Sequence, residues 1–469
     1  MTTMAEKIRG VLLKKILESS GAYVQALLAE ATPIICINKG AGKSRVMNFK
    51  ALFDNNNLFW LQEGAWEYFI ESKELEKIRA KAAFAQPLEG GSPGKKPPQE
   101  PENEETIELG FGSQYADIAS MSAPERIELI DEAKNRLDSL AASKDHEAIT
   151  EALVETTQAA ALANRAALLE AMHNADEDAK ARTQSMVDST RDMVKSSAHL
   201  ISEDIFSDEL MNPLVEKSNG TIIQHMTKVF LNGTAFLSYY NNIVSTSSLI
   251  NKIRVSFDKK YKKYYRGLLP HLHADDITME KIFYKGMRAV RAEEFHNWAT
   301  GFLIHDIGKA SAVGYHEGDA AYNRDLVEEH VKVGYTAVMN KTNYPREAGL
   351  ITGYHHEYYG DPSGYGYFRS YLEQYKKMRP DAYQDACITY ELEPMMDFQA
   401  ISYFPAKILE IIDIYDSITD PNRKYRKALD PEEALAMIKE EFIEKHFKID
   451  VILYDIFADF VRQKLENKK

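Results

Sequence analysis

The chain has only two cysteines, Cys36 and Cys387, in 469 residues, which excludes a disulfide framework as the source of its stability. No apolar run approaches the length needed to cross a bilayer, and the N-terminus lacks a signal-type apolar core. We therefore expect a cytoplasmic protein without a membrane partner. Positive charge is also in deficit, since the formal net charge is −14. This argues against an extended nucleic-acid partner, but a small phosphorylated ligand needs only a local basic pocket.

Glycine and proline are absent between Pro124 and Pro213. This segment is rich in Ala, Glu and Lys, which favour long helices. We predict a helical connector over residues 111–213. The pattern fits equally a coiled-coil region that joins two copies into a homodimer and an ordinary helical bundle.

Prolines and glycines gather instead in residues 85–110, together with many charges. Such a segment cannot bury enough apolar surface to order itself, so we predict a disordered linker there. Residues 1–84 precede it and predict a small mixed α/β domain, whose role, sensory or other, the residues leave open. Within it, the pattern from Ile8 to Leu28 is helical, and Pro33 to Ile37 is a short strand candidate.

A glycine-rich stretch, Gly40-Ala41-Gly42-Lys43-Ser44, follows that strand. It resembles the end of a phosphate-binding loop, but Ile37 stands where that motif needs its first glycine. We favour an ordinary turn after a strand.

The stretch that organises the rest of the chain ends in His305, Asp306, Gly308 and Lys309. Apolar residues recur upstream at helical spacing, which predicts a helix with a buried face. A histidine and a carboxylate at the end of a buried helix must be satisfied there. A hydrogen-bonded core pair would do this, and so would a metal ion.

More candidate ligands follow in the sequence: His330, the doublet His355-His356 before Glu357, and Asp413. Glu410, Asp413 and Asp416 recur every three residues, so they line one stripe of an otherwise apolar helix. Imidazole nitrogens and carboxylate oxygens together suit Fe, Mn or Zn better than Ca or Mg.

The order of these motifs resembles the HD superfamily of metal-dependent phosphohydrolases, and within it the HD-GYP family of cyclic di-GMP phosphodiesterases. The resemblance runs from about Thr221 to near the C-terminus, and it implies an all-helical HD-domain bundle over residues 214–469. The fold class expected for the whole chain is mainly α, with the connector and the small α/β domain before this bundle.

The resemblance also implies two divalent transition metal ions, iron or manganese. His225 takes the place of the family's first ligand, with His271, His273 and His296 as rivals in a long insertion. One ion would be held by His225, His305, Asp306 and Asp413. The other would be held by His330, His355 and His356, with Asp306 as a bridge. Thr221 stands where some members have a glutamate for a third metal, so two ions are expected.

For the substrate, the resemblance gives Asp306 and Lys309 catalytic roles and places Lys309, Gly364 and Tyr365 in contact with it. Arg423 and Arg426 would bind its phosphates, because guanidinium groups match phosphate geometry. The chain has Gly364-Tyr365-Gly366 where the family has Gly-Tyr-Pro, and one extra residue lies between Tyr358 and Ser363. We expect a looser or differently shaped loop.

The insertion, about residues 241–291, contains a run of basic and aromatic residues from Lys259 to Arg266. A solvated helix face is the favoured interpretation, and a lid over the site is the alternative.

Two functions are predicted from the resemblance. The first is a phosphodiesterase that hydrolyses cyclic di-GMP or a related cyclic dinucleotide. The alternative is a weakly active or inactive cyclic-dinucleotide sensor or scaffold, which the changed signature favours. A different HD phosphohydrolase acting on nucleotides is a third, weaker interpretation.

Overall fold

The computed structural model describes residues 6–13, 16, 27, 32–38, 43–49, 66–71, 74–75, 77–78, 105–109, 118, 121–141, 145–173, 179–202, 221–246, 248–310, 324–379, 383–421 and 427–466. The chain forms two compact units. One comprises Met1–Met121 with Lys217–Gly220, and the other comprises Ser122–Glu216 with Thr221–Lys469.

The first unit contains a five-stranded antiparallel sheet in the order β3-β2-β4-β1-β5. The strands are β1 (Glu6–Leu12), β2 (Pro33–Asn38), β3 (Lys43–Asn48), β4 (Trp66–Glu71) and β5 (Glu105–Leu109). Ile34, Cys36 and Ile70 are fully buried. β2 confirms the strand predicted from Pro33 onward.

Two predictions in this unit are wrong in part. The helix predicted from Ile8 is wrong over its first residues, because Ile8 to Leu12 belong to β1. This strand pairs with β4 on one side and β5 on the other, and such pairing overrides local preference. The predicted linker ends in β5, where Ile107 lies opposite Ile8. The earlier part of that linker lies outside the described residues.

The glycine-rich stretch is not a phosphate-binding loop. β3 begins at Lys43 and pairs antiparallel with β2, with Asn38 opposite Lys43. A phosphate-binding loop leads from a strand into a helix, whereas here a second strand follows. Gly40 to Gly42 themselves lie outside the described residues.

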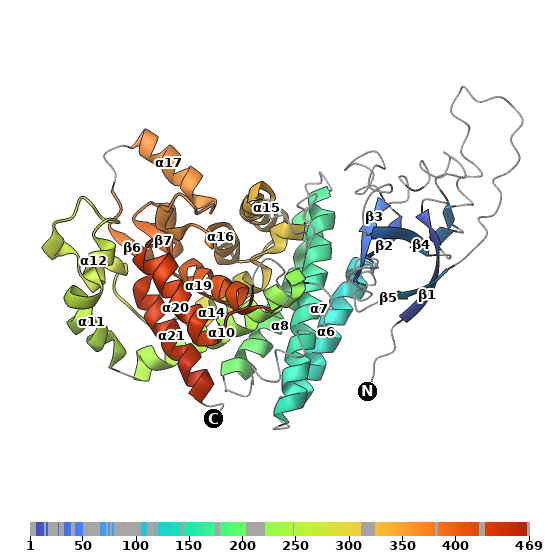
Figure 1. Cartoon of the computed structure of the whole chain (residues 1–469), viewed down its shortest axis with the longest axis horizontal. Coiled ribbons are helices and arrows are strands. Elements are labelled where there is room, and N and C mark those ends of the chain that lie inside the picture. Colours follow the sequence, from blue (N-terminus) through green and yellow to red (C-terminus); the bar gives the residue numbers. More distant parts are fainter. Residues whose placement is uncertain are drawn as a thin grey trace, which may run out of the picture. The chain divides into compact units, whose positions relative to one another are not determined.

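The second unit is mainly helical, as predicted (Figure 1). Its long helices are α6 (Ala123–Leu140), α7 (His146–His173), α8 (Ala179–Ser202), α10 (Thr221–Thr246), α14 (Ala292–Ile304), α15 (Arg324–Lys341), α19 (Phe404–Thr419) and α21 (Val451–Glu466). Shorter ones are α11 (Leu249–Lys260), α12 (Lys262–Tyr265), α13 (Met279–Ile282), α16 (Arg346–Tyr354), α17 (Phe368–Met378), α18 (Leu392–Met396) and α20 (Pro431–Lys439).

The C-terminal part is not purely helical, which corrects the expectation of an all-helical bundle. β6 (Ala386–Thr389) and β7 (Ala400–Tyr403) form a two-stranded parallel sheet. All four residues of β6 are buried. Because a strand buried on both faces has no alternation of polar and apolar residues, its sequence gave no strand signal.

The connector helices belong to the same compact unit as the helices after residue 220. α7 and α8 pack against α10, α14 and α15 (Figure 1). A buried polar seam joins them, since Asn164 donates to Thr190 Oγ1 over 2.8 Å and Tyr344 OH donates to Asn164 Oδ1. The boundary predicted near residue 213 therefore does not separate two units, and this packing matches the helical-bundle alternative. A homodimer through these helices stays a prediction.

The insertion is an anchored part of the core. Tyr261 and Tyr265 are buried, and their hydroxyl groups donate to Asp455 and Asp450 over 2.8 and 2.7 Å. Lys259, at the end of α11, is exposed. Tyr261 and Tyr265 thus fix the segment to α21 and to the residue before it, while Lys259, Lys260, Lys263 and Arg266 are exposed, which agrees with the favoured interpretation.

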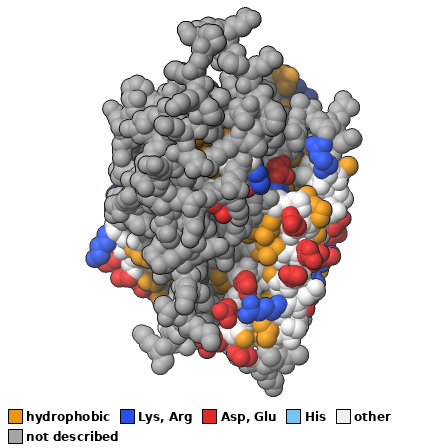
Figure 2. Space-filling model, turned by 90° about the vertical axis from the view of Figure 1, so that its right-hand side faces the viewer, with side chains coloured by type: hydrophobic (Ala, Val, Ile, Leu, Met, Phe, Trp, Pro, Cys, Tyr) orange, Lys and Arg blue, Asp and Glu red, His pale blue; other side chains and the backbone are white. Residues whose placement is uncertain are grey.

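On the described part of the face in Figure 2, Asp and Glu side chains recur among hydrophobic ones. This agrees with the net charge of −14. Among the residues that the structure describes, no helix combines the length and apolar character required to cross a membrane.

The start of α14 is held by a buried carboxylate. Glu294 accepts hydrogen bonds from Arg288 Nη1 and Nη2 over 2.8 and 2.7 Å and from the Arg291 backbone N–H over 3.0 Å. Glu294 is only 7% exposed. Burial opposes its ionisation, but these donors prevail and lower the pKa of Glu294 to about 2.

We expect Glu294→Gln to lower the free energy of unfolding by about 3 kcal/mol at neutral pH. Because the folded pKa lies below the unfolded one, this contribution is complete above about pH 4.5 and is lost as the pH falls toward 2. Urea unfolding at pH 7 and at pH 3.5 measures it. The exposed neighbour Glu293→Gln is the control, and an equal effect of both changes at the two pH values would contradict the prediction.

Candidate metal centre

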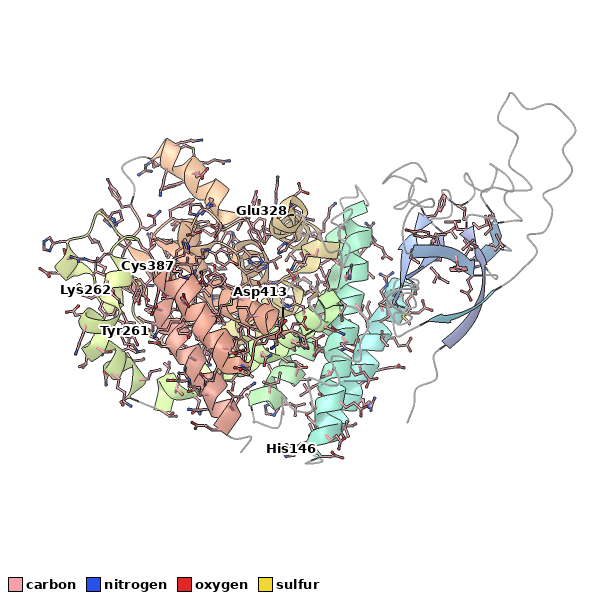
Figure 3. All side chains as sticks on the ribbon, in the orientation of Figure 1. His146, Tyr261, Lys262, Glu328, Cys387 and Asp413 are labelled. Carbon is pink, nitrogen blue, oxygen red and sulfur yellow. The ribbon has the colours of Figure 1, made fainter. Side chains whose placement is uncertain are left out.

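Five segments of the helical unit bring seven imidazole and carboxylate side chains together. They are His225 from α10, His305 and Asp306 after α14, His330 from α15, His355 and His356 after α16, and Asp413 from α19. Each is less than a tenth exposed. Figure 3 shows Asp413 in the middle of the unit.

The donor atoms fall into groups of three that lie within 4.8 Å of one another. The groups are His225, His305 and Asp413; His330, His355 and His356; and His305, Asp306 and His355. The first two match the two ligand sets expected from the sequence, and the third joins them through Asp306. The buried groups could therefore hold a metal ion.

In the first group, His225 Nε2 lies 2.9 Å from Asp413 Oδ1 and 3.3 Å from His305 Nε2. Asp306 Oδ2 is 3.5 Å from His225 Nε2 and 3.6 Å from His305 Nε2. Donor atoms bound to one ion at about 2.1 Å lie about 3.0 Å apart when their bonds are perpendicular and about 3.4 Å apart at the tetrahedral angle. The spacing of this group fits such an ion.

The second group approaches the other oxygen of the same carboxylate. Asp306 Oδ1 is 3.2 Å from His330 Nε2 and 3.8 Å from His355 Nε2, and these two nitrogens are 3.4 Å apart. His356 Nε2 lies 3.7 Å from Asp413 Oδ2. Each oxygen of Asp306 thus faces one group, as a bridging carboxylate requires.

Hydrogen bonds at Nδ1 orient three of the rings. His305 donates to the Phe302 carbonyl over 2.9 Å and His355 to the Thr352 carbonyl over 3.0 Å. His225 Nδ1 lies 2.7 Å from Asp416 Oδ2. Because His305 and His355 donate their Nδ1 protons to these carbonyls, their Nε2 lone pairs point into the site, which is how ligand histidines are usually held.

The protonation states also suit metal binding. Burial lowers the pKa of His305 to about 3 and lowers the pKa of His330 and His356, so these rings are neutral near pH 7. Burial opposes ionisation of Asp306, yet the Lys309 ammonium holds the pKa of that carboxyl well below its usual range.

His225 behaves differently. Burial alone would lower its pKa, but the hydrogen bonds to Asp413 and Asp416 raise the pKa to about 9. In the absence of metal the ring therefore carries a proton between two carboxylates. A cation at Nε2 would take the place of that positive charge, so metal and proton compete for this position.

One further atom bears on the fit of a metal. Asp306 Oδ1 is buried, and within the described residues its nearest possible donors are His330 Nε2 at 3.2 Å and His355 Nε2 at 3.8 Å, without the geometry of a good hydrogen bond. A buried carboxylate oxygen without a donor is costly, and a cation beside it would satisfy it. The residues present therefore fit a metal ion.

The turn after Asp306 is held close to α15. A Cβ built on Gly308 would lie 2.0 Å from the His330 carbonyl oxygen and 2.7 Å from the Gly334 nitrogen. Only glycine permits this approach. It brings the segment that carries Asp306 against the helix that carries His330.

The predicted substrate residues divide into two sets. Lys309 pairs with Asp306 Oδ2 and is largely buried. The Tyr365 ring lies 4.4 Å from the His356 ring, centre to centre, which places Gly364 and Tyr365 beside the second group. Arg423 and Arg426 lie outside the described residues.

Hydrogen bonds and close packing define the shape of the Gly364-Tyr365-Gly366 loop, which was expected to be looser or differently shaped than in the resembled family. The backbone N–H groups of Tyr365 and Gly366 donate to the His356 carbonyl over 2.9 and 3.1 Å. A Cβ on Gly366 would lie 2.5 Å from Glu357 Cγ, and Glu357 itself accepts from the Arg369 backbone N–H over 2.8 Å. Proline at this position would lose a hydrogen bond and displace Glu357.

We therefore expect Gly366→Pro to destabilise the protein by about 1 to 3 kcal/mol, although it restores the signature of the resembled family. Thermal unfolding of the wild type and the variant measures this. Gly366→Ala keeps the N–H and separates the steric part from the hydrogen bond. A proline variant as stable as the wild type would refute the account of the loop.

For two residues of the site the sequence predicted the position on the helix but not the partner. Asp416 was recognised on the stripe of α19 but not as the partner of His225, and Glu410 on the same stripe accepts from the Tyr358 backbone N–H. The rival histidines lie elsewhere: His271 stacks on Tyr383, and His273 pairs with Asp275.

Comparison with known proteins finds no match, whether with protein-family descriptions, with curated proteins or with solved structures. What the site does must therefore be inferred from its own side chains.

Proposed function

We propose that this protein is a metal-dependent phosphodiesterase of the HD-GYP type, which hydrolyses cyclic di-GMP or a related cyclic dinucleotide. One observation carries the proposal: two groups of buried donor atoms face the two oxygens of Asp306. A carboxylate that bridges two ions is typical of sites that cleave phosphate esters. The ligand residues also follow the order of the family's motifs.

We propose two divalent ions, iron or manganese, held by the two groups. When bound, such a pair polarises a phosphate oxygen and lowers the pKa of a water molecule between the ions. The chain's own contribution is to fix that geometry. Buried imidazoles aligned through their Nδ1 hydrogen bonds have little freedom to rearrange, so the site is organised before substrate arrives.

Among the described residues, Lys309 is well placed to act on the substrate. Its ammonium group contacts Asp306 Oδ2 and retains partial access to solvent, with 12% of its side chain exposed. From there it can donate a hydrogen bond to a phosphate oxygen and stabilise the charge of the departing alkoxide. Tyr365 offers an aromatic face beside His356 for a nucleobase or sugar. Arg423 and Arg426 are proposed to bind the phosphates.

The proposal is tested with protein purified under reducing conditions and loaded with Fe²⁺ or Mn²⁺. It is incubated with cyclic di-GMP and with cyclic GMP-AMP, and the products are separated by chromatography. We expect a linear dinucleotide whose formation requires the metal and stops with chelator. If elemental analysis finds that the protein retains no transition metal, the proposed enzymatic function is refuted.

A sensor or scaffold is the second candidate, and the signature loop favours it. The loop contains Gly366 in place of proline and an extra residue before it, so its contacts with substrate differ from those of the family. In that case the metal-loaded protein would bind the cyclic dinucleotide in equilibrium dialysis and leave it uncut.

A further inference from the structure

The chain makes an unusual turn directly after the ligands His355 and His356. Tyr358, Tyr359 and Gly360 follow one another with φ values of 48°, 52° and 80°. The left-handed conformation costs a residue with a side chain about 1 to 2 kcal/mol. Two tyrosines in succession therefore need support from their surroundings. The turn lies in the stretch that carries the extra residue of the signature.

That support comes from α19. Glu410 Oε1 accepts a hydrogen bond from the Tyr358 backbone N–H over 3.2 Å, and its other oxygen pairs with Lys407. The Lys407 ammonium donates to the Lys448 carbonyl over 2.8 Å and lies 3.7 Å from the centre of the Tyr359 ring. Glu410 and Lys407 are 0% and 1% exposed.

Both tyrosine side chains are tied down as well. Tyr359 OH donates to Asp450 Oδ2 over 2.8 Å, and Tyr358 OH lies 3.2 Å from His356 Nδ1. The second contact reaches a candidate ligand directly. Whatever fixes Tyr358 therefore also limits the rotation of the His356 ring.

A buried ion pair is a poor source of stability, because removing two charges from water costs about as much as their attraction returns. The pair of Glu410 and Lys407 invites another explanation. Glu410 lies three residues before Asp413, so one helix carries both a candidate ligand and the acceptor for the turn. This links the position of His356 to that of Asp413, whose Oδ2 is 3.7 Å from His356 Nε2.

We propose that Glu410, held in place by Lys407, is a positioning residue: it fixes the left-handed turn so that His355 and His356 meet the second metal. The inference rests on the proposed metal centre and deepens it. Glu410 acts through the backbone N–H of Tyr358 and touches neither metal nor substrate. The essential property is an acceptor oxygen at this position, and Lys407 compensates the charge of that oxygen.

Two double variants of the full chain separate the acceptor from the charge. Lys407→Met with Glu410→Gln removes both charges and keeps an oxygen for Tyr358. Lys407→Met with Glu410→Leu removes both charges and the oxygen. Neither leaves an unpaired buried charge, so both should fold. Lys407→Met with Glu410→Met replaces the leucine variant if that one fails to fold, since methionine adapts to irregular core space.

Mn²⁺ is titrated into each metal-free protein, and the free ion and the spin-coupled pair are followed by electron paramagnetic resonance. We expect the glutamine variant to resemble the wild type. The leucine or methionine variant should bind one equivalent normally and the second about 10- to 100-fold more weakly, with loss of the coupled signal. Without metal it should unfold at a lower temperature than the glutamine variant, because the Tyr358 backbone N–H has lost its acceptor, and it should still be folded at the temperature of the titration.

Equal binding of both equivalents by the glutamine and leucine variants would overturn the inference, and so would equal weakening in both. If the wild type binds two ions and cleaves cyclic dinucleotide, either of these results would leave the proposed function intact. A wild type that binds no Mn²⁺ would instead remove the proposed function and this inference together.

Discussion

Replacing Asp306 with alanine is expected to abolish binding of both metal ions and to reduce turnover by about 10³-fold or more. The two oxygens of this carboxylate face the two groups of donor atoms, so its loss removes the bridge between them. Its loss also removes the ion pair with the Lys309 ammonium. Elemental analysis of the purified variant gives the metal content, and product formation from cyclic di-GMP gives the rate.

The control for this change has two parts. Asp276→Ala removes an exposed carboxylate and should leave metal content and rate unchanged. Asp306→Asn keeps the shape of the side chain and removes only its negative charge. This variant should fold, but it should bind metal ions poorly at the bridging position. Full metal content in Asp306→Ala would show that the ions are held elsewhere.

Gly308→Ala should be almost as damaging, although it adds a single methyl group and removes no ligand. The new Cβ would lie 2.0 Å from the His330 carbonyl oxygen and 2.7 Å from the Gly334 nitrogen. Both are backbone atoms, so no side-chain rotation can relieve the clash. The segment that carries Asp306 and the helix that carries His330 must separate. We expect a loss of about 3 kcal/mol in the free energy of unfolding and a marked loss of metal affinity.

Chemical denaturation of the metal-free protein isolates the packing part of this effect, and titration with Mn²⁺ measures the rest. Gly267→Ala is the matched control, because a Cβ there would meet nothing within 4 Å. If Gly308→Ala unfolded at the same denaturant concentration as Gly267→Ala, the close approach of the turn to α15 would be refuted.

Much of the candidate site was predictable because its residues follow simple periods. The apolar spacing before His305 predicted α14, and the three-residue spacing of Asp413 and Asp416 predicted their shared stripe on α19. The choice of His225 over its rivals needed the resemblance as well as the pattern. The structure brings His225 to the other side chains and leaves His271 and His273 away from them.

The remainder depended on partners that are distant in the sequence. β1 has a helical pattern in part of its length but is a strand, because β4 and β5 pair with it from far along the chain. Nothing in the sequence near Lys407 or Glu410 shows that Tyr358 and Lys448 will meet them. The close approach at Gly308 was equally hidden, since any glycine in a turn has the same local signal.

Because α7 and α8 pack on α10, α14 and α15, domain recombination, in evolution or by design, must keep these helices together. A fusion that replaced everything before residue 214 with another domain would remove α6, α7 and α8. The apolar faces of these helices and the buried hydrogen bonds of Asn164 complete the core. The natural cut for recombination lies before Ser122, where the second compact unit begins. A domain joined at this point would leave α6, α7 and α8 in one unit with the candidate metal centre.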